Sequence, residues 1–199
     1  MFVEIAETYV DITDTGDINL DITLDCGQAF RWKQNPDKSW SGVVKGIETT
    51  VCKTENGLRF YGITAQQFTD IFYDYFDFGK DYNKILAQLS HDKVLKKAID
   101  DYGTIRILNQ EPWEALCSFI ISQCNNIPRI KKIIEALSRE CGEPICIGEE
   151  MKKHLSSNAL PYSFPTAEAI YALGERGLSE LKVGFRAKYI FDAVSKILD

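Results

Sequence analysis

The residues of this sequence best suited to binding chemistry lie in three short segments, and the first is Cys26–Trp32, CGQAFRW. Gly27 permits a backbone conformation or a close approach that a Cβ atom would block. Phe30 and Trp32 can pack beneath such a turn, and Arg31 can brace an acidic side chain. The segment therefore fits two interpretations, a structural glycine turn with a supporting arginine or a direct contact with a ligand.

The second segment, Ser122–Arg129 (SQCNNIPR), joins two apolar stretches. Asn126 can cap the helix that follows, and the N-terminal amides and dipole of that helix would suit a phosphate or another anion. Arg129 would project from the first turn of this helix. Capping explains one asparagine but not a four-residue polar string, so a cap and a binding loop are equal interpretations.

The third segment, Val183–Tyr189 (VGFRAKY), places an aromatic residue beside an arginine and after a glycine. A protein needs this combination to wedge between nucleic-acid bases and to fill the resulting gap with hydrogen bonds. The alternative is a glycine at a helix boundary, followed by Phe185 in the hydrophobic core.

Hydrophobic periodicity predicts the elements that must position these segments. Alternating residues over the first sixty positions indicate strands, with turn-forming residues between them. Asn56-Gly57 lies between two such runs and predicts a type I′ hairpin, because both central residues of that turn need positive φ. Thr64 can cap the first of the helices that follow. The strands are expected at 18–24, 40–44, 48–54 and 58–63, and the helices at 64–75, 83–89 and 92–102.

The second half of the sequence is helical throughout. A helix that starts at Pro112 is apolar nearly all round, so it should be central to its domain. Another helix, from Ile127, should bury its isoleucines. Shorter helices are expected at 166–173 and 178–181, and a last one at 186–198. Lys131, Lys132 and Arg139 are expected to face away from the core, and Ile190, Val194, Ile197 and Leu198 to face inward.

The change of period divides the chain into two expected domains, 1–108 and 109–199, of the α+β class. The formal net charge of −6 argues at first sight against a nucleic-acid partner. The first domain, however, holds 12 basic against 17 acidic residues, and the second 11 against 12. The helical domain could therefore present a positive face. Its basic clusters are Arg129, Lys131 and Lys132, and Lys182, Arg186 and Lys188.

Composition and cysteine spacing exclude several classes of protein. With 45% hydrophobic residues the sequence is globular, and no apolar run approaches the roughly 18 residues of a membrane helix. The first residues of the chain include acidic side chains, whereas a secretory signal would begin with basic and continue with apolar residues. We therefore expect a location inside the cell, either in the cytoplasm or bacterial nucleoid or in a nucleus. The cysteines form no C-x-x-C pair, so free and mostly buried thiols and no metal site are expected. They are Cys26, Cys52, Cys117, Cys124, Cys141 and Cys146.

In this order, the three segments resemble the 8-oxoguanine DNA glycosylases of the helix–hairpin–helix superfamily. That family shows G-Q-[SA]-F-R-W, then S-x-x-N-N-I-[AP]-R-I between helices, then L-[GK]-x-G-[YF]-R-A-[RK]-Y. The corresponding segments here are GQAFRW at 27–32, SQCNNIPRI at 122–130 and LKVGFRAKY at 181–189. The resemblance implies an antiparallel, TATA-binding-protein-like sheet domain, a helical domain that grips double-stranded DNA, and excision of oxidised guanine without a cofactor.

The resemblance also implies roles for individual residues. The damaged guanine, paired with cytosine, would be flipped out of the duplex. The carbonyl of Gly27 would accept the N7–H that 8-oxoguanine has and guanine lacks. Phe185 would be the wedge, and Arg129 and Arg186 would hydrogen-bond the estranged cytosine.

Two features depart from the family pattern. Cys124 replaces the first of three loop asparagines, ahead of Asn125 and Asn126, and a thiol fills the gap and hydrogen-bonds less well, which leaves the opposite-base preference open. The sequence also contains no L-P-G-[IV]-G motif with the nucleophilic lysine and later aspartate that carry glycosylase and AP lyase chemistry. Lys188 and Lys196 do not match that lysine. The chain is therefore expected to be an inactive amino-terminal portion of such an enzyme.

Other functions stay open from the sequence alone. One is a non-catalytic protein that binds DNA lesions, and another is an alkylpurine DNA glycosylase of the same superfamily, which the Gly27 motif disfavours. A third alternative is a helical scaffold that does not bind nucleic acid, and only the negative net charge of the chain supports it. A monomer is expected, with a dimer as the alternative through the surface that the hairpin would otherwise cover.

Overall fold

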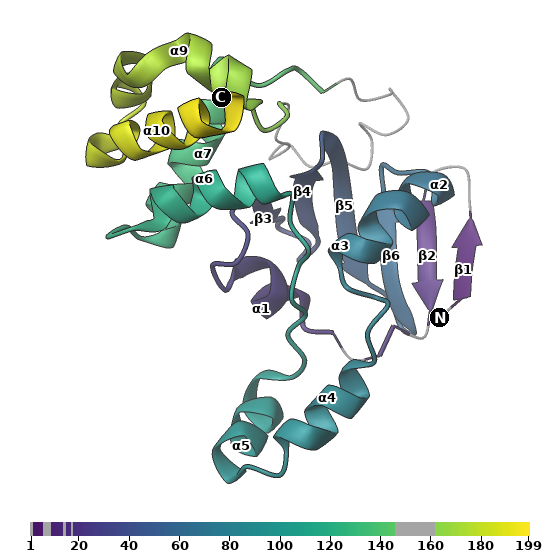
Figure 1. Cartoon of the computed structure of the whole chain (residues 1–199). Coiled ribbons are helices and arrows are strands. Elements are labelled where there is room, and N and C mark those ends of the chain that lie inside the picture. The colour runs from purple at the N-terminus through teal and green to yellow at the C-terminus, as the bar shows by residue number, and fades with distance from the viewer. Residues whose placement is uncertain (1, 6–8, 14, 17, 146–161) are drawn as a thin grey trace.

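The computed structural model describes residues 2–5, 9–13, 15–16, 18–145 and 162–199. A six-stranded antiparallel sheet lies beside a group of helices from the second half of the chain (Figure 1), so the α+β class is confirmed. The strand order is β1-β2-β6-β5-β4-β3. The strands are β1 (Phe2–Ile5), β2 (Tyr9–Thr13), β3 (Trp32–Gln34), β4 (Trp40–Val44), β5 (Ile47–Lys53) and β6 (Gly57–Tyr61).

The hairpins β4–β5 and β5–β6 use different turns. β4 and β5 are joined by Lys45 and Gly46, both with positive φ (48° and 76°), which is the type I′ combination. The predicted hairpin at Asn56-Gly57 joins β5 to β6, but neither residue has positive φ, so the predicted turn type is wrong. Gly57 is needed for space, because a Cβ there would lie 1.9 Å from the carbonyl oxygen of Ile12 in β2.

The strand predicted over 18–24 is wrong, because this stretch forms α1 (Leu20–Asp25). Asn19 caps the helix by accepting a hydrogen bond from the amide of Ile22 at 3.1 Å. An apolar pair spaced by four residues fits a strand face and a helix face equally, and here the cap and packing select the helix. The buried residues of α1 follow helical spacing and are Leu20, Thr23 and Leu24.

Most of the predicted helices are present within a residue or two, and Thr64 forms the predicted cap as part of a capping box. The two helices predicted at 166–173 and 178–181 are both present within residues 167–180, separated by Gly174, whose φ of 71° and ψ of 170° are not helical. The helices are α2 (Ala65–Gln67), a π-helical turn (Phe68–Phe72), α3 (Tyr73–Tyr75), α4 (Tyr82–Leu89), α5 (Lys93–Tyr102), α6 (Pro112–Ser122), α7 (Ile127–Cys141), α9 (Ala167–Glu180), a 3₁₀ turn (Gly184–Arg186) and α10 (Ala187–Leu198).

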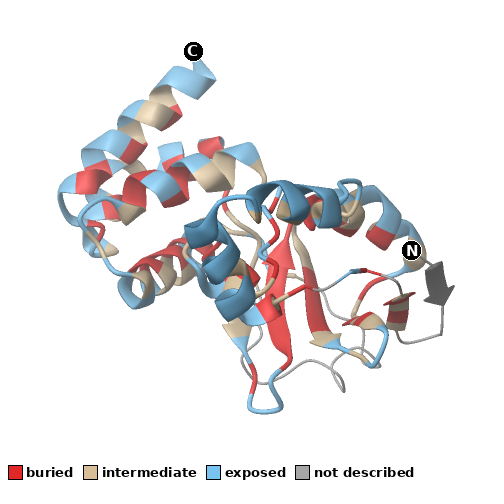
Figure 2. Ribbon diagram, turned by 90° about the horizontal axis from the view of Figure 1, so that it is seen from below, coloured by how far each residue is buried: buried red, intermediate tan, exposed pale blue. Residues whose placement is uncertain are grey.

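Two hydrophobic cores hold these elements together. One packs aromatic side chains of the π-helical turn and α3 against the sheet, and Phe60 and Phe72 are fully buried in it. The other lies among α6, α7, α9 and α10, with Ile121 and Ile170 fully buried. Figure 2 shows buried residues along the central strands and the inner faces of the helices.

Several residues expected inside are exposed. Ile190 and Val194 of α10 are buried as predicted, but Ile197 is 52% exposed and Leu198 39%. In α6, Phe119 is 66% exposed, so the helix forms one wall of its core and is not central. By contrast, Ile130, Ile133, Ile134 and Leu137 of α7 are buried as expected.

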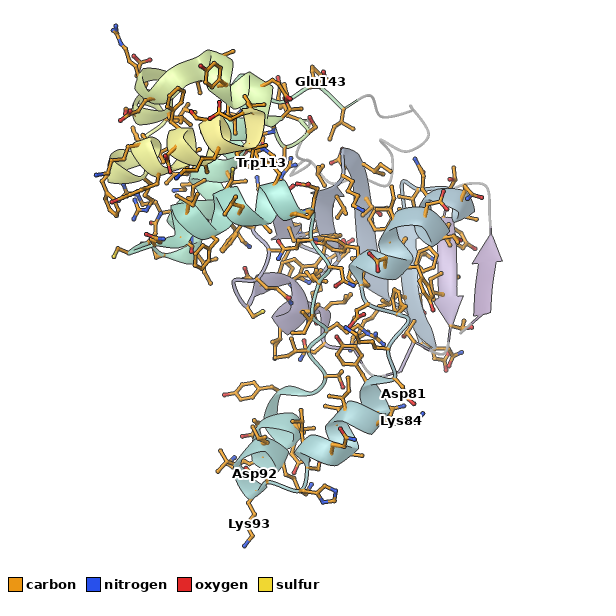
Figure 3. All side chains as sticks on the ribbon, in the orientation of Figure 1. Asp81, Lys84, Asp92, Lys93, Trp113 and Glu143 are labelled. Carbon is orange, nitrogen blue, oxygen red and sulfur yellow. The ribbon has the colours of Figure 1, made fainter. Side chains whose placement is uncertain are left out.

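The helical hairpin α4–α5 stands away from both cores. Neither helix contains a buried residue, and Asp92 and Lys93 mark its tip, far from the group formed by α6, α7, α9 and α10 (Figures 1 and 3). None of the helices in the described ranges has the length and apolar character needed to cross a bilayer.

The cysteines in the described ranges are free thiols, as predicted, but most are not buried. Cys117 is buried, while Cys26 and Cys124 are exposed. Cys146, also expected to be a buried thiol, lies outside the described residues. The two exposed thiols belong to two of the segments singled out in the sequence, Cys26 to the first and Cys124 to the second.

Candidate functional site

The Gly27 turn connects α1 to β3 and is built into both cores. Gly27 has φ +90°, a conformation that L side chains rarely adopt. Ala29 and Trp32 pack into the sheet core, whereas Phe30 packs into the helical core. The predicted packing of Phe30 and Trp32 is therefore split, and this short segment joins the two halves of the protein.

The Gln28 side chain fastens this turn to residues 103–111, the connection that precedes α6. Its Nε2 donates to the carbonyls of Thr23 (2.8 Å) and Arg106 (2.9 Å), and its Oε1 accepts from the amide of Leu108 at 3.0 Å. Gln110 donates to the carbonyl of Gln28. No described residue donates to the carbonyl of Gly27 itself, so this acceptor is available in a turn whose neighbours are all fixed.

Arg31 braces an acid, as the sequence predicted. It is 4% exposed, its Nη1 lies 3.8 Å from Oε2 of Glu114 in α6, and its Nη2 donates to the carbonyl of Tyr162. Burial raises the pKa of Glu114 to about 7, and the charge of Arg31 opposes that rise. Because the pair links the segment before β3 to the first turn of α6, it is a second tie between the two cores.

The loop between α6 and α7 satisfies its own backbone through its asparagines. Asn126 caps α7 by accepting from the amide of Arg129 at 3.0 Å, which confirms the cap. Asn125 donates to the carbonyl of Ile121 at 3.0 Å and accepts from the amide of Asn126. Cys124 is exposed with φ 49°, in the left-handed region.

Arg186 is buried against this loop. It is 4% exposed, and its guanidinium donates from Nε to the carbonyl of Gln123 at 2.7 Å and from Nη2 to that of Cys124 at 3.0 Å. Further bonds reach the carbonyl of Gln123 from Nη2 and that of Val183 from Nη1. Four of the five N–H donors of an arginine are therefore used within the protein.

Phe185, by contrast, points away from the core. Its side chain is 54% exposed and meets the ring of Tyr189, itself 46% exposed, edge to face at 6.4 Å between centroids. Gly184 before it has φ 70° and marks the helix boundary that the sequence predicted. The alternative of a core phenylalanine is wrong, since α10 buries Ala187 and Ile190 instead.

The first turn of α7 brings all three predicted segments together. A Cβ on Gly27 would lie 3.4 Å from Cδ1 of Ile127, so the glycine turn lies against the start of α7. The loop before Ile127 is held by Arg186 from the start of α10. Arg129, in the same turn of α7, is exposed, and no described residue pairs with its guanidinium.

The contact of Lys131 with the Gly27 turn was not predicted from the sequence, which placed this side chain away from the core. Its side chain is 19% exposed and bonds to Asp25 and to the carbonyl of Trp32, on the two sides of the Gly27 turn. The helical spacing of four residues between Ile127 and Lys131 was the available signal, because both then face the same neighbour. Of the two basic clusters, the exposed members are Arg129, Lys132, Lys182 and Lys188.

Comparison with known proteins identifies what these features belong to. Residues 11–116 match the family model described as the 8-oxoguanine DNA glycosylase N-terminal domain. The N-glycosylase/DNA lyase of Saccharomyces cerevisiae is 41% identical over 96 residues, which is 48% of this chain and 23% of the yeast protein.

Two solved structures match almost the whole chain. The structure of MBOgg1 in complex with a low affinity DNA ligand has a TM-score of 0.90 and 40% identity, covering 99% of this chain and 65% of that one. The 8-oxoguanine glycosylase/lyase of Clostridium acetobutylicum, in complex with double-stranded DNA containing cytosine opposite 8-oxoG, has a TM-score of 0.87 and 33% identity, covering 100% and 65%.

The fold of this chain is thus shared with these two structures along almost its whole length. The chain belongs to the 8-oxoguanine DNA glycosylase family, whose N-terminal domain model covers more than half of it. It spans about 65% of the length of the two solved structures.

Proposed function

We propose that this chain is the DNA-binding and lesion-recognising portion of an 8-oxoguanine DNA glycosylase/AP lyase. It binds double-stranded DNA that contains 8-oxoguanine opposite cytosine and receives the flipped base at the Gly27 turn. The observation that supports this most directly is the Gly27 carbonyl, an unused acceptor in a turn that Gln28 and Arg31 fasten on both sides. Such a protein acts where the DNA is, in a bacterial nucleoid or a nucleus.

Gly27 separates the damaged base from guanine by one hydrogen bond. Its carbonyl accepts the N7–H of 8-oxoguanine, while guanine would present a lone pair to the same oxygen. A buried acceptor left unpaired costs about 1–3 kcal/mol, which corresponds to roughly a 5- to 150-fold difference in binding. Positive φ at Gly27 turns this carbonyl in a direction that a residue with a side chain would resist.

The second and third segments, around the start of α7 and the start of α10, contact the DNA strand opposite the lesion. Phe185 wedges into the stack, and the exposed guanidinium of Arg129 donates to the estranged cytosine. Arg186 has one N–H left for that base and otherwise holds the loop in place. Cys124, Asn125 and Asn126 line the space vacated by the flipped base.

These 199 residues contain no L-P-G-x-G motif and no lysine that matches the nucleophile of that motif. We therefore propose that a polypeptide of this sequence binds the lesion without forming a Schiff base. Within it we propose two units, 1–108 for the sheet and the Gly27 turn and 109–199 for the helices. The two hydrophobic cores support this division, and Phe30 is the buried residue that crosses it.

The test compares Gly27→Ala with a matched glycine variant, Gly174→Ala. Both glycines have positive φ (90° and 71°), so both substitutions strain the backbone, but Gly174 lies in the kink of α9. Affinities for duplexes with 8-oxoguanine or guanine opposite cytosine are measured by fluorescence anisotropy. Wild type and Gly174→Ala should prefer the lesion roughly tenfold, and Gly27→Ala should lose the preference. Equal affinity of the wild type for both duplexes contradicts the proposal, as does a covalent band trapped by borohydride.

A further inference from the structure

We propose that Lys131 is a positioning residue that fixes the Gly27 turn against α7 and thereby sets the selectivity for the lesion. This inference rests on the proposed function. Lys131 touches no part of the base site itself, and it acts through the two chain segments that enter and leave the turn.

The ammonium of Lys131 bridges the two stems of the Gly27 turn. Its Nζ donates to Oδ1 of Asp25, the last residue of α1, at 2.6 Å. It also donates to the carbonyl of Trp32, the first residue of β3, at 3.0 Å. The six residues between these stems include Gly27, so one side chain holds both ends of the recognition turn.

The same face of α7 carries the contact with Gly27. Ile127 lies one helical turn before Lys131, and its Cδ1 is the atom that a Cβ on Gly27 would approach at 3.4 Å. One turn beyond Lys131, Glu135 pairs with Lys33 of β3 at 3.1 Å. This row of contacts fixes the turn along the axis of α7, whose first turn also carries Arg129.

Two anchors therefore hold the turn from opposite sides. Gln28 ties it to the connection before α6, through the carbonyl of Arg106 and the amide of Leu108. Lys131 ties it to α7. A binding group must be held to within a fraction of an ångström to be selective, so loss of one anchor should blur the position of the Gly27 carbonyl.

This tie can be removed without unfolding the protein. Asp25 is 48% exposed, so its pair with Lys131 contributes little to stability. The methylenes of Lys131 still pack in Lys131→Met, and Gln28 and Arg31 stay in place. The neighbouring Lys132 is exposed, and no described residue pairs with its side chain, so Lys132→Met removes the same charge without touching the turn.

The experiment measures the full 199-residue chain in two ways. The first is the ratio of affinities for 8-oxoguanine and guanine duplexes. Lys131→Met should reduce this ratio roughly tenfold, the effect expected when one buried acceptor is misplaced, whereas Lys132→Met should keep it and lower both affinities alike. Lys131→Arg should restore most of the ratio, because a guanidinium can also donate to both Asp25 and Trp32.

The second measurement needs no DNA and separates the two proposals. Hydrogen exchange of the amides at 26–31 should be faster in Lys131→Met than in Lys132→Met or wild type. An unchanged selectivity ratio in Lys131→Met, or unchanged exchange of the turn, overturns the role of Lys131. If the wild type shows no selectivity while exchange still responds to Lys131→Met, the proposed function fails but the anchor stands as a structural one.

Discussion

The two ends of the candidate site are built on opposite principles. The Gly27 turn is fixed by Lys131 of α7, by the bond that its own Gln28 donates to the connection before α6, and by the packing of its residues into both cores. The Phe185 end presents a half-exposed ring on an exposed helix start, next to a loop that contains a strained cysteine. A group that distinguishes two bases by one proton needs a fixed position, whereas a wedge must be free to enter the duplex.

Phe185 and Arg186 are adjacent in sequence but should behave oppositely, which is the sharpest test of this comparison. Arg186 is buried and satisfies the carbonyls of Gln123 and Cys124, so Arg186→Ala leaves them without their partner. We expect a loss of about 3 kcal/mol in the free energy of unfolding, measured by urea denaturation. Phe185→Ala removes an exposed ring, so stability should change by less than about 0.5 kcal/mol.

Affinity for lesion DNA gives the converse result. Phe185→Ala should lower it roughly tenfold while the chain stays folded, since a wedge contributes to the complex and not to the free protein. Lys188→Ala, on the exposed face of α10, serves as the charge control for Arg186→Ala. If Arg186→Ala is as stable as Lys188→Ala, the buried anchoring of the loop is wrong. If Phe185→Ala binds lesion DNA as tightly as the wild type, the wedge role of Phe185 is wrong.

The fixed end of the site should show itself in the pH dependence of stability. The pKa of Glu114 is raised to about 7 in the folded protein, above its ordinary value of 4.5, so the folded state holds a proton that the unfolded state releases between these values. Stability should therefore fall as pH rises through this window and level off above about pH 7. Between pH 5 and pH 8 the contribution of Glu114 amounts to roughly 2–3 kcal/mol.

Glu114→Gln should remove that slope, because an amide does not titrate. Denaturation of wild type, Glu114→Gln and the exposed Glu140→Gln at pH 5 and pH 8 measures it, and only Glu114→Gln should be flatter. A Glu114→Gln chain with the wild-type slope would mean that the carboxylate is not shielded between the two cores. The tie between Arg31 and α6 would then be weaker than its burial indicates.

What the sequence could predict depended on where each partner lies along the chain. The cap formed by Asn126 was predictable, since the amide it accepts from is three residues away. The acidic partner of Arg31 was expected in kind but not by position. The helical spacing from Ile127 could have placed Lys131 on the face of α7 toward the turn, but its partner Asp25 lies 106 positions away and could not be named from the sequence.

The buried state of Arg186 could not be predicted at all, because its acceptors are backbone carbonyls of a distant loop. Backbone acceptors are the same for every residue type, so they leave no trace in a sequence. The false strand over 18–24 has a related cause. Alternation favoured a strand over the local cap of Asn19 on the amide of Ile22, and the second bond of Asn19, to the carbonyl of Tyr102, 83 positions away, left no local pattern.

The smallest expected effect concerns Cys124, where a substitution that relieves backbone strain should raise the stability of the protein. Its φ of 49° is in the left-handed region, which Asn adopts more readily than Cys does. Cys124→Asn should therefore raise the free energy of unfolding by about 0.5–1 kcal/mol. Cys124→Ala is the matched control, because it removes the thiol without relieving the strain and should not be stabilising. Equal stability of the Asn and Ala variants would show that the backbone of this loop stores no such strain, and that Arg186 alone determines its shape.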